Sequence, residues 1–364
     1  MNPVNIEDER AKLLDYVPAL EVVRGDTVES IHHAAVAIVD VSGRLIASLG
    51  NPQVVTYMRS TAKPLQSLPL LESGAPAQFN LSEKEIALVC ASHTGTDMHV
   101  RVAQGILKKI GLSESDLKCG THPPFDRAKA DELVRSGQEP TPIRHNCSGK
   151  HAGMLAYARH MNYPVGSYLE MSSPVQKEII SAVTEMTGVT PSMGVDGCSA
   201  PNFALPLQAA AWAYAKLANP ASLPPERAAA CGTAVQAMIN HPELVAGEGR
   251  FDTHVMRAGR GQLVSKGGAE GFQGIGIFPG VLGPDALAYG VAIKIADGAY
   301  VHRSVSIIAL SVLHQIGIRI EQKDQDQELE PFQTYRVHNC RSLEVGEVRA
   351  NFHLSFSDAL LTRS

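Results

Sequence analysis

Apolar residues follow two periods along this 364-residue chain, and the shorter period lies near its two ends. Near the start, HAAVAIVDVSGRLIASLG (33–50) holds two β-rich runs around a Ser-Gly pair, a pattern typical of a hairpin. Much later, ALAYGVAIKIADGAYV (286–301) has the same character around Asp297-Gly298, and Asp-Gly is a strong hairpin-turn signal. The pattern therefore predicts hairpins near both ends.

The segments between the hairpins follow the longer period. Their apolar residues recur at intervals of three and four, which predicts helices. A further helix over 304–318 (SVSIIALSVLHQIGI) is expected to cover the sheet, whereas the polar segment from about 322 is expected at the surface. The helices predicted between the hairpins span 100–111, 149–161, 174–187, 203–218 and 226–240.

Strands at both ends with helices between them predict an α+β fold. We expect an antiparallel sheet built from about 20–50 and about 260–320, with a helical subdomain over about 60–255. The chain is long enough for one large buried core, so we expect a single domain over 1–364.

Composition and charge narrow the function classes. A hydrophobic content of 44% with 19% charged residues suits an ordinary globular protein. The net charge of −5, with no block rich in Lys or Arg, argues against a nucleic-acid partner. The longest apolar runs fall short of the ~18 residues of a membrane span, and the charged first residues do not resemble a secretory signal. We therefore expect a cytoplasmic protein without a membrane partner.

The first candidate for chemistry is the segment RSTAKP (59–64). Residues three apart lie on one face of a helix, so the Ser60 hydroxyl and the Lys63 amine can meet. A neutral lysine can accept the serine proton and make the hydroxyl a nucleophile toward an amide or ester carbonyl. Burial or a second cation must keep such a lysine neutral. By itself, Ser-x-x-Lys far more often marks an ordinary helix start.

Two further segments extend this candidate. CASHTGTDMH (90–99) places Ser92 in a loop of small residues, and LVSKGGAEG (263–271) ends a β-like run at Lys266. Serine β-lactamases combine Ser-x-x-Lys, a loop serine and a Lys-Thr-Gly strand in this chain order. The second and third elements are degenerate here, so the order is suggestive only.

A second cluster carries cysteines. RHNCSGKHAGM (144–154) places Cys147 three residues before Lys150, and GVDGCSAPN (194–202) places Cys198 in a loop beside Asp196. Thiolates suit zinc, which takes four ligands, or three and a water. There is no Cys-x-x-Cys pair, so spacing alone favours the alternative that both thiols pack in the core. The six cysteines are too sparse for a disulfide scaffold.

Seven segments together resemble the rhizobial-type L-asparaginases, the third structural class, also called the asparaginase II family. The resemblance runs from about residue 20 to 300, and the NCSGKH and HPE-VAGEGR patterns are long and specific. A chance match across all seven is very improbable. The segments, in chain order, are RSTAKP, CASHTGTD, CGTHPP, HNCSGKHAGM, VDGCSAPN, HPELVAGEGRFDT and LVSKGGAEG.

This resemblance implies a fold similar to serine β-lactamases and serine-dependent glutaminases, and hydrolysis of L-asparagine to aspartate and ammonia by a homodimer. It implies Ser60 as the nucleophile and Lys63 as its base. Ser92 and Lys266 would form a second Ser–Lys pair that positions protons and lowers the basicity of Lys63.

The resemblance also implies one Zn²⁺ per chain. An amine must lose its proton to bind a metal, so a site with a lysine ligand would be weak and pH-sensitive, and would modulate substrate binding. Asp252 stands where the type member of the family has a cysteine beside the metal cysteines. The implied zinc ligands are Cys147, Lys150 and Cys198, with Asp196 near the bound water and Arg59 and His151 beside the substrate.

Two alternatives remain open at this point. The same fold could serve a glutaminase or a β-lactam-recognising serine hydrolase. The chain could also be a zinc-held module that binds a small amide without turning it over, although intact Ser–Lys elements argue against that.

Overall fold

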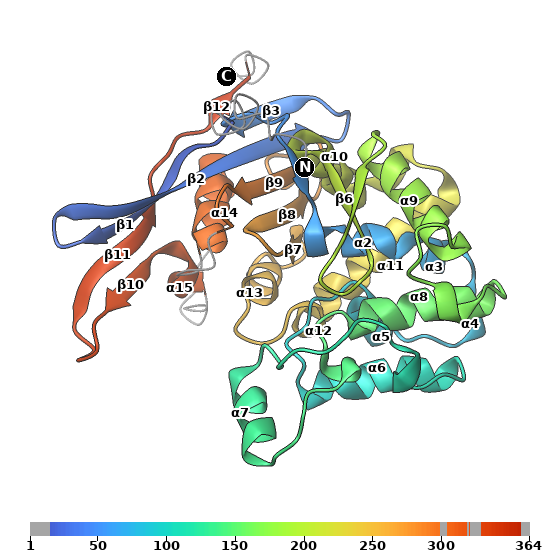
Figure 1. Ribbon diagram of the computed structural model, residues 1–364. Helices are drawn as coiled ribbons and strands as arrows, with labels where there is room; N and C mark the ends of the chain where they lie inside the picture. Colours follow the sequence, from blue (N-terminus) through green and yellow to red (C-terminus); the bar gives the residue numbers. More distant parts are fainter. Residues whose placement is uncertain (1–14, 299–303, 319, 321–328, 358–364) are drawn as a thin grey trace, which may run out of the picture.

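The computed structural model describes residues 15–298, 304–318, 320 and 329–357. Its main feature is an antiparallel sheet of nine strands in the order β10-β11-β1-β2-β9-β8-β7, with β3 paired to β2 and to β12 (Figure 1). The strands are β1 (Val17–Arg24), β2 (Thr27–Asp40), β3 (Leu45–Leu49), β7 (Leu263–Gly267), β8 (Phe272–Ile277), β9 (Tyr289–Ile295), β10 (Tyr335–His338), β11 (Glu344–Ala350) and β12 (Ser355–Phe356).

The long strand β2 joins two parts of this sheet. Its first half is mostly exposed and pairs with β1, which in turn pairs with β11. Its second half, 34–40, is fully buried and pairs with β9. The first half, with β1, β10 and β11, forms an arm that projects from the body of the molecule (Figure 1).

Helix α10 (Leu207–Ala218) packs directly on the body of the sheet, against β2, β8 and β9. A Cβ atom on Gly290 would lie 1.7 Å from the Ala211 carbonyl oxygen, and one on Gly274 would meet the Tyr214 ring at 2.3 Å. Only glycine lets the helix approach so closely. Residues alternate between the faces of a strand, so Val291 points away from α10, and α14 (Ser304–Gln315) packs against β8 and β9 as well.

The helical part follows the first hairpin and contains a small sheet of β4 (Val55–Tyr57), β6 (Pro201–Pro206) and β5 (Ser192–Val195). Short 3-10 turns link many of its helices: η1 (Arg59–Ala62), η2 (Glu114–Asp116), η3 (Pro142–Arg144), η4 (Val165–Ser167) and η5 (Pro220–Ser222). The remaining helices are α2 (Lys63–Gln66), α3 (Leu68–Glu72), α4 (Ala75–Gln78), α5 (Glu83–Val89), α6 (Asp97–Lys109), α7 (Arg127–Arg135), α8 (Ser148–His160), α9 (Pro174–Thr187), α11 (Pro225–Asn240), α12 (Pro242–Val245), α13 (Phe251–Ala258) and α15 (Glu330–Gln333).

The structure confirms the α+β class, the sheet from both chain ends and the helical part between them. The helix predicted over 203–218 is wrong in its first four residues, which lie in β6. The second strand of the later hairpin falls on 299–301, outside the described residues. Most of the polar segment from about 322 also lies outside them, but the chain after it returns to the sheet as β10 and β11.

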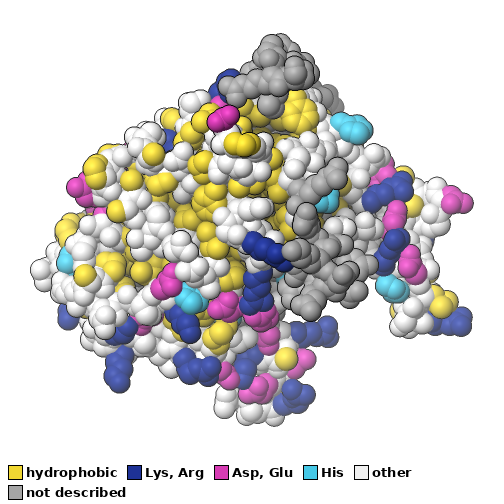
Figure 2. Space-filling model, turned by 180° about the vertical axis from the view of Figure 1, so that it is seen from behind, with side chains coloured by type: hydrophobic (Ala, Val, Ile, Leu, Met, Phe, Trp, Pro, Cys, Tyr) yellow, Lys and Arg dark blue, Asp and Glu magenta, His cyan; other side chains and the backbone are white. Residues whose placement is uncertain are grey.

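On the face shown in Figure 2, acidic and basic side chains are intermingled, and no purely basic surface is seen there. Within the part of the chain that the structure describes, no helix is long and apolar enough to cross a membrane.

Candidate active site

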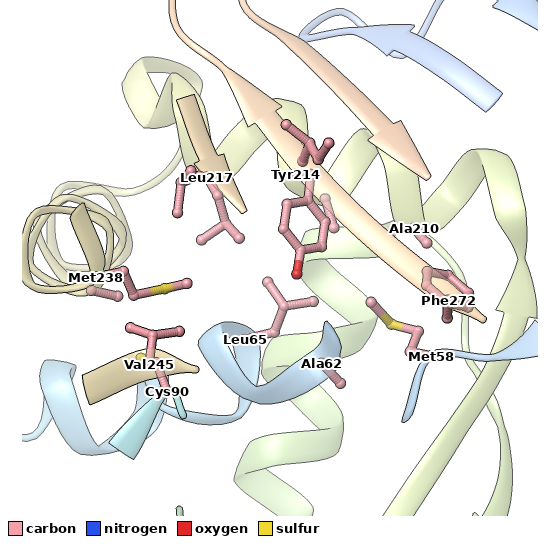
Figure 3. Packing of buried hydrophobic residues seen from close by; sticks show 14 of the residues in the cluster. Met58, Ala62, Leu65, Cys90, Ala210, Tyr214, Leu217, Met238, Val245 and Phe272 are labelled. Carbon is pink, nitrogen blue, oxygen red and sulfur yellow. The ribbon is translucent and has the colours of Figure 1, made fainter. Parts of the chain in front are cut away.

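Ser60 lies in the 3-10 turn η1, and Lys63 is the first residue of the α2 helix that follows without a break. The turn is fixed from the sheet side, because the buried Tyr214 hydroxyl of α10 donates a hydrogen bond to the Thr61 carbonyl at 2.8 Å. Figure 3 shows Met58, Ala62 and Leu65 in the apolar cluster around Tyr214. The hydrophobic core therefore holds the backbone that carries Ser60.

Arg59 has an unusual backbone conformation, with φ of +52°, a region that non-glycine residues adopt rarely. Its N–H donates to Asn202 Oδ1 at 3.1 Å, and its guanidinium Nε donates to Asp196 Oδ1 at 2.8 Å. Its Nη1 lies 3.6 Å from Glu270 Oε1. Strained residues of this kind persist where the surroundings over-determine them, often at functional sites. These contacts turn Arg59 toward the same region as Ser60.

The buried Lys63 amine contacts three oxygens. Its Nζ lies 2.5 Å from the Ala91 carbonyl, 2.8 Å from Ser92 Oγ and 3.5 Å from the Asn146 carbonyl. Carbonyls only accept hydrogen bonds, whereas a hydroxyl can also donate. In this structure the Lys63 amine donates to all three oxygens, so its donors are satisfied inside the protein.

The Ser60 hydroxyl is close to this amine in sequence but has a different environment. Among the described residues it makes no hydrogen bond, and Ser60 keeps a small exposed fraction of 9%. Lys63 therefore hydrogen-bonds Ser92 in this structure, while the hydroxyl of the nearly buried Ser60 makes no hydrogen bond among the described residues.

Lys266 completes the group from strand β7. Gly268 lets the end of this strand lie close to the start of the turn η1, because a Cβ there would lie 3.0 Å from the Met58 carbonyl oxygen. The Lys266 amine is buried and donates to the Gly267 carbonyl at 2.6 Å. Burial is the main cause that lowers the pKa of Lys266 to about 8; Lys63 acts in the same direction, and Asp252 opposes them. Two lysines thus share one buried region.

Cys147, Lys150 and Cys198 also converge, at the start of α8 and the loop after β5. Lys150 Nζ donates to Cys198 Sγ at 3.0 Å. The hydrogen bond from Cys147, with Lys150 and His151 nearby, lowers the pKa of Cys198 far below its ordinary value despite burial. The same hydrogen bond, together with burial, raises the pKa of Cys147. Without metal, the cluster is therefore a thiolate–ammonium pair with one protonated thiol.

The donor set of this cluster fits a zinc ion. The described residues contain no group of three His, Cys, Asp or Glu side chains that could hold a metal, so a zinc ion here would need the Lys150 amine as a ligand. His151 is fully buried, its Nδ1 is hydrogen-bonded to the Tyr168 hydroxyl at 2.7 Å, and its Nε2 has no hydrogen-bond partner among the described residues. Soft thiolates beside an unsatisfied buried nitrogen are compatible with a bound cation.

Ser92 contacts Lys63 and, among the described residues, no hydrogen bond joins it to Lys266, the partner expected for it from the sequence. The Arg59–Asp196 ion pair and the Cys198–Asp196 contact, 3.8 Å long, link the serine side to the cysteine side. His151 lies buried behind Cys198, whereas Arg59 is partly exposed. The sequence did not single out Asn146 or Asn202, although both lie inside the recognised segments. Asn146 accepts from Lys63 through its backbone carbonyl, and the Asn202 side chain accepts from the Arg59 backbone N–H; a sequence pattern does not reveal such backbone partners.

A sequence model of the L-asparaginase II family matches residues 20–350. This chain belongs to the L-asparaginase II family. The match covers nearly the whole chain, so membership of this amidohydrolase family assigns the protein to enzymes that act on small amides. Among curated proteins, no sequence matches.

Solved structures similar to this asparaginase II family member include two bacterial glutaminases. One, from Bacillus, is 13% identical, with a TM-score of 0.43 over 78% of this chain and 90% of that chain. The other is a covalent complex of a Bacillus subtilis glutaminase with 5-oxo-L-norleucine, also 13% identical, with a TM-score of 0.33 over 72% of this chain and 79% of that chain.

Proposed function

We propose that this protein hydrolyses L-asparagine to L-aspartate and ammonia, with Ser60 as nucleophile and Lys63 as base. The observation that carries the proposal is the buried Lys63 amine, which touches Ser92 and two carbonyls and lies one helical turn after Ser60, whose hydroxyl makes no hydrogen bond among the described residues. An amide hydrolase needs a hydroxyl that substrate can reach and a base that is shielded from water.

The proton and the electron pair can be followed through both steps. Ser60 Oγ attacks the side-chain amide carbonyl while its proton passes to Lys63. Ser92, in hydrogen-bond contact with that amine, relays the proton to the leaving nitrogen, so ammonia departs and an aspartyl ester of Ser60 remains. Water then attacks the ester, giving aspartate and regenerating the Ser60 hydroxyl.

The ion pair beside Ser60 suits the ends of an amino-acid substrate. Arg59 offers a positive fork for the α-carboxylate, and Asp196 offers a negative group for the α-ammonium. When the substrate binds, its carboxylate can pair with Arg59 and its ammonium with Asp196, so each side chain keeps a partner of opposite charge. The substrate-side residues of the proposal are Arg59, Asp196 and, behind Cys198, His151.

We also propose one Zn²⁺ held by Cys147, Lys150 and Cys198. When bound, the ion supplies a fixed positive charge beside Asp196, which orders the substrate-binding side of the site. Zinc content measured by elemental analysis should fall well below one per chain in Cys198→Ser. Retention of a full equivalent in that variant would remove the ligand assignment.

Ammonia release is the direct test. Wild type should release ammonia from L-asparagine, Ser60→Ala should lose this activity, and Lys63→Ala should lose most of it. The matched control is Ser136→Ala, at an exposed serine on the far end of α7. Full activity in Ser60→Ala would exclude Ser60 as the nucleophile.

A glutaminase of the same fold is the second candidate, favoured by the glutaminases found among similar structures. Side-by-side kcat/KM values for asparagine and glutamine decide between the two, and a chromogenic β-lactam tests the third substrate class. Saturable binding of asparagine without turnover, with zinc present, would instead support a binding module. The proposed homodimer is tested by light scattering after size exclusion.

A further inference from the structure

Asp252 is a buried carboxylate that the proposed mechanism does not use. It lies in the first turn of α13 and accepts three hydrogen bonds: from Ser265 Oγ at 2.7 Å, from Gln273 Nε2 at 2.9 Å and from the Gly267 N–H at 2.7 Å. A helix N-terminus favours negative charge, and three donors satisfy it. The Asp252 carboxylate therefore has three hydrogen-bond donors inside the protein.

The donors of Asp252 surround Lys266. Ser265 and Gly267 are its two neighbours on β7, and Gln273 is opposite Gly267 on β8. Gly267 is held on both sides: its N–H donates to Asp252, while its carbonyl accepts from the Lys266 amine at 2.6 Å. Both charged groups therefore bind the backbone of the same residue.

Two cations and one carboxylate act on the charge of Lys266. Lys63 on α2 and Arg250 before α13 disfavour its charged form, whereas Asp252 favours it. Cys90, at the end of α5, is a further titratable group near Lys266, and burial raises its pKa to about 11, so it stays neutral. Asp252 is therefore the carboxylate that favours the charged form of Lys266.

We propose that Asp252 is the positioning residue and counter-ion of Lys266: it holds the N–H of Gly267, the residue whose carbonyl the ammonium binds, and it balances the buried positive charge. Lys266 titrates near pH 8 in this environment, so about one molecule in ten carries the neutral amine at pH 7. Loss of the Asp252 charge removes the group that favours the ammonium, and the pKa of Lys266 then falls by about one unit or more.

The experiment measures this titration without using turnover. The free energy of unfolding is compared between chains that carry Lys266 and the Lys266→Met variant, from pH 6 to 10. The pH at which this difference begins to change reports the folded-state pKa of Lys266. We expect it near 8 in wild type and about one unit lower in the Asp252→Asn background.

Two matched variants separate charge from structure. Ser265→Ala removes one hydrogen bond to Asp252 but keeps the carboxylate, so the pH at which the stability difference begins to change, called the midpoint below, should stay near 8. The double variant Asp252→Asn with Gln273→Glu exchanges the amide and the carboxylate across their mutual hydrogen bond, so the midpoint should return toward 8. This double variant also supplies the test if Asp252→Asn alone does not fold.

An unchanged midpoint in Asp252→Asn would overturn the proposal, as would an equal shift in Ser265→Ala or a midpoint that stays low in the double variant. The kinetic consequence rests on the proposed Ser–Lys hydrolysis. In the pH profile of kcat/KM, the apparent pKa that reports Lys266 should shift by the same amount as the midpoint from unfolding. If the midpoint from unfolding shifts and this apparent pKa does not, Lys266 is outside the reaction while its pairing with Asp252 stands.

Discussion

Gly149 provides a sharp test of how the site is assembled. It lies at the second position of α8, where that helix crosses α5, and a Cβ there would be 2.2 Å from the Leu88 carbonyl oxygen and 2.7 Å from Leu88 Cγ. The contact with the carbonyl would have to lengthen to about 3.4 Å, an ordinary van der Waals distance. Gly149→Ala therefore has to push two helices apart by backbone movement, which no side-chain rotation can replace.

This separation would act on Lys63 directly. The chain just after α5 supplies the Ala91 carbonyl and Ser92, and the residue before the α8 cap supplies the Asn146 carbonyl. Over-packing costs about 1–3 kcal/mol, and a clash with backbone puts this site at the upper end. The better helix propensity of alanine returns up to ~1 kcal/mol. We expect a net loss of about 2 kcal/mol in the free energy of unfolding.

Urea unfolding and ammonia release measure the two consequences together. The matched control is Gly232→Ala, inside α11, where a Cβ would meet nothing within 4 Å. That change should stabilise the protein by about 0.5–1 kcal/mol and leave its activity alone. If Gly149→Ala were as stable as Gly232→Ala, or kept full activity while destabilised, the close approach of α5 and α8 would not be what positions Lys63.

Three further outcomes follow from single contacts. Tyr214→Phe removes the hydrogen bond to the Thr61 carbonyl and should lower the free energy of unfolding by about 1 kcal/mol in urea titrations, with a matching loss of kcat. An unchanged kcat would mean that this bond does not hold the turn η1. Asn202→Ala removes the acceptor that holds the Arg59 N–H and should raise KM for asparagine about tenfold (~1.4 kcal/mol) with little change in far-UV circular dichroism; an unaltered KM contradicts this role. Below pH 8 Lys266 is protonated in both the folded and the unfolded chain, but between about pH 8 and 10.5 only the folded chain has released the proton. The free energy of unfolding of wild type should therefore rise by up to about 3 kcal/mol relative to Lys266→Met over that range. A difference between the two proteins that does not change with pH would refute the low pKa of Lys266.

The periodic segments were read correctly from the sequence where burial is one-sided or complete. The helices near 100–111, 149–161, 174–187 and 226–240 all form, because their apolar spacing matches a single buried stripe or a wholly buried interior. The start of the segment 203–218 was misassigned because its first residues are apolar throughout, a pattern that suits a buried strand equally well.

The sequence pattern does not predict the C-terminal strands, because they lack a regular apolar pattern. Strand β11 is largely exposed or half-buried, and its sequence EVGEVRA carries charges on the open side of the projecting arm. Its place in the sheet depends on pairing with β1, more than 320 positions away, from Glu21 opposite Arg349. Long-range pairing of this kind leaves no local signal.

The sequence by itself determined the chemical inventory of this protein: a Ser-x-x-Lys pair, a loop serine, a strand lysine and two cysteines with a lysine, in an order that resembles the L-asparaginase II family. Tertiary structure alone decided the partners. It set Lys63 against Ser92 and left the Ser60 hydroxyl without a hydrogen bond among the described residues, and it placed Asp252 against the backbone of Gly267, which Lys266 also binds. These pairings depend on backbone approach, down to single missing Cβ atoms, and such distances arise only when the whole core packs.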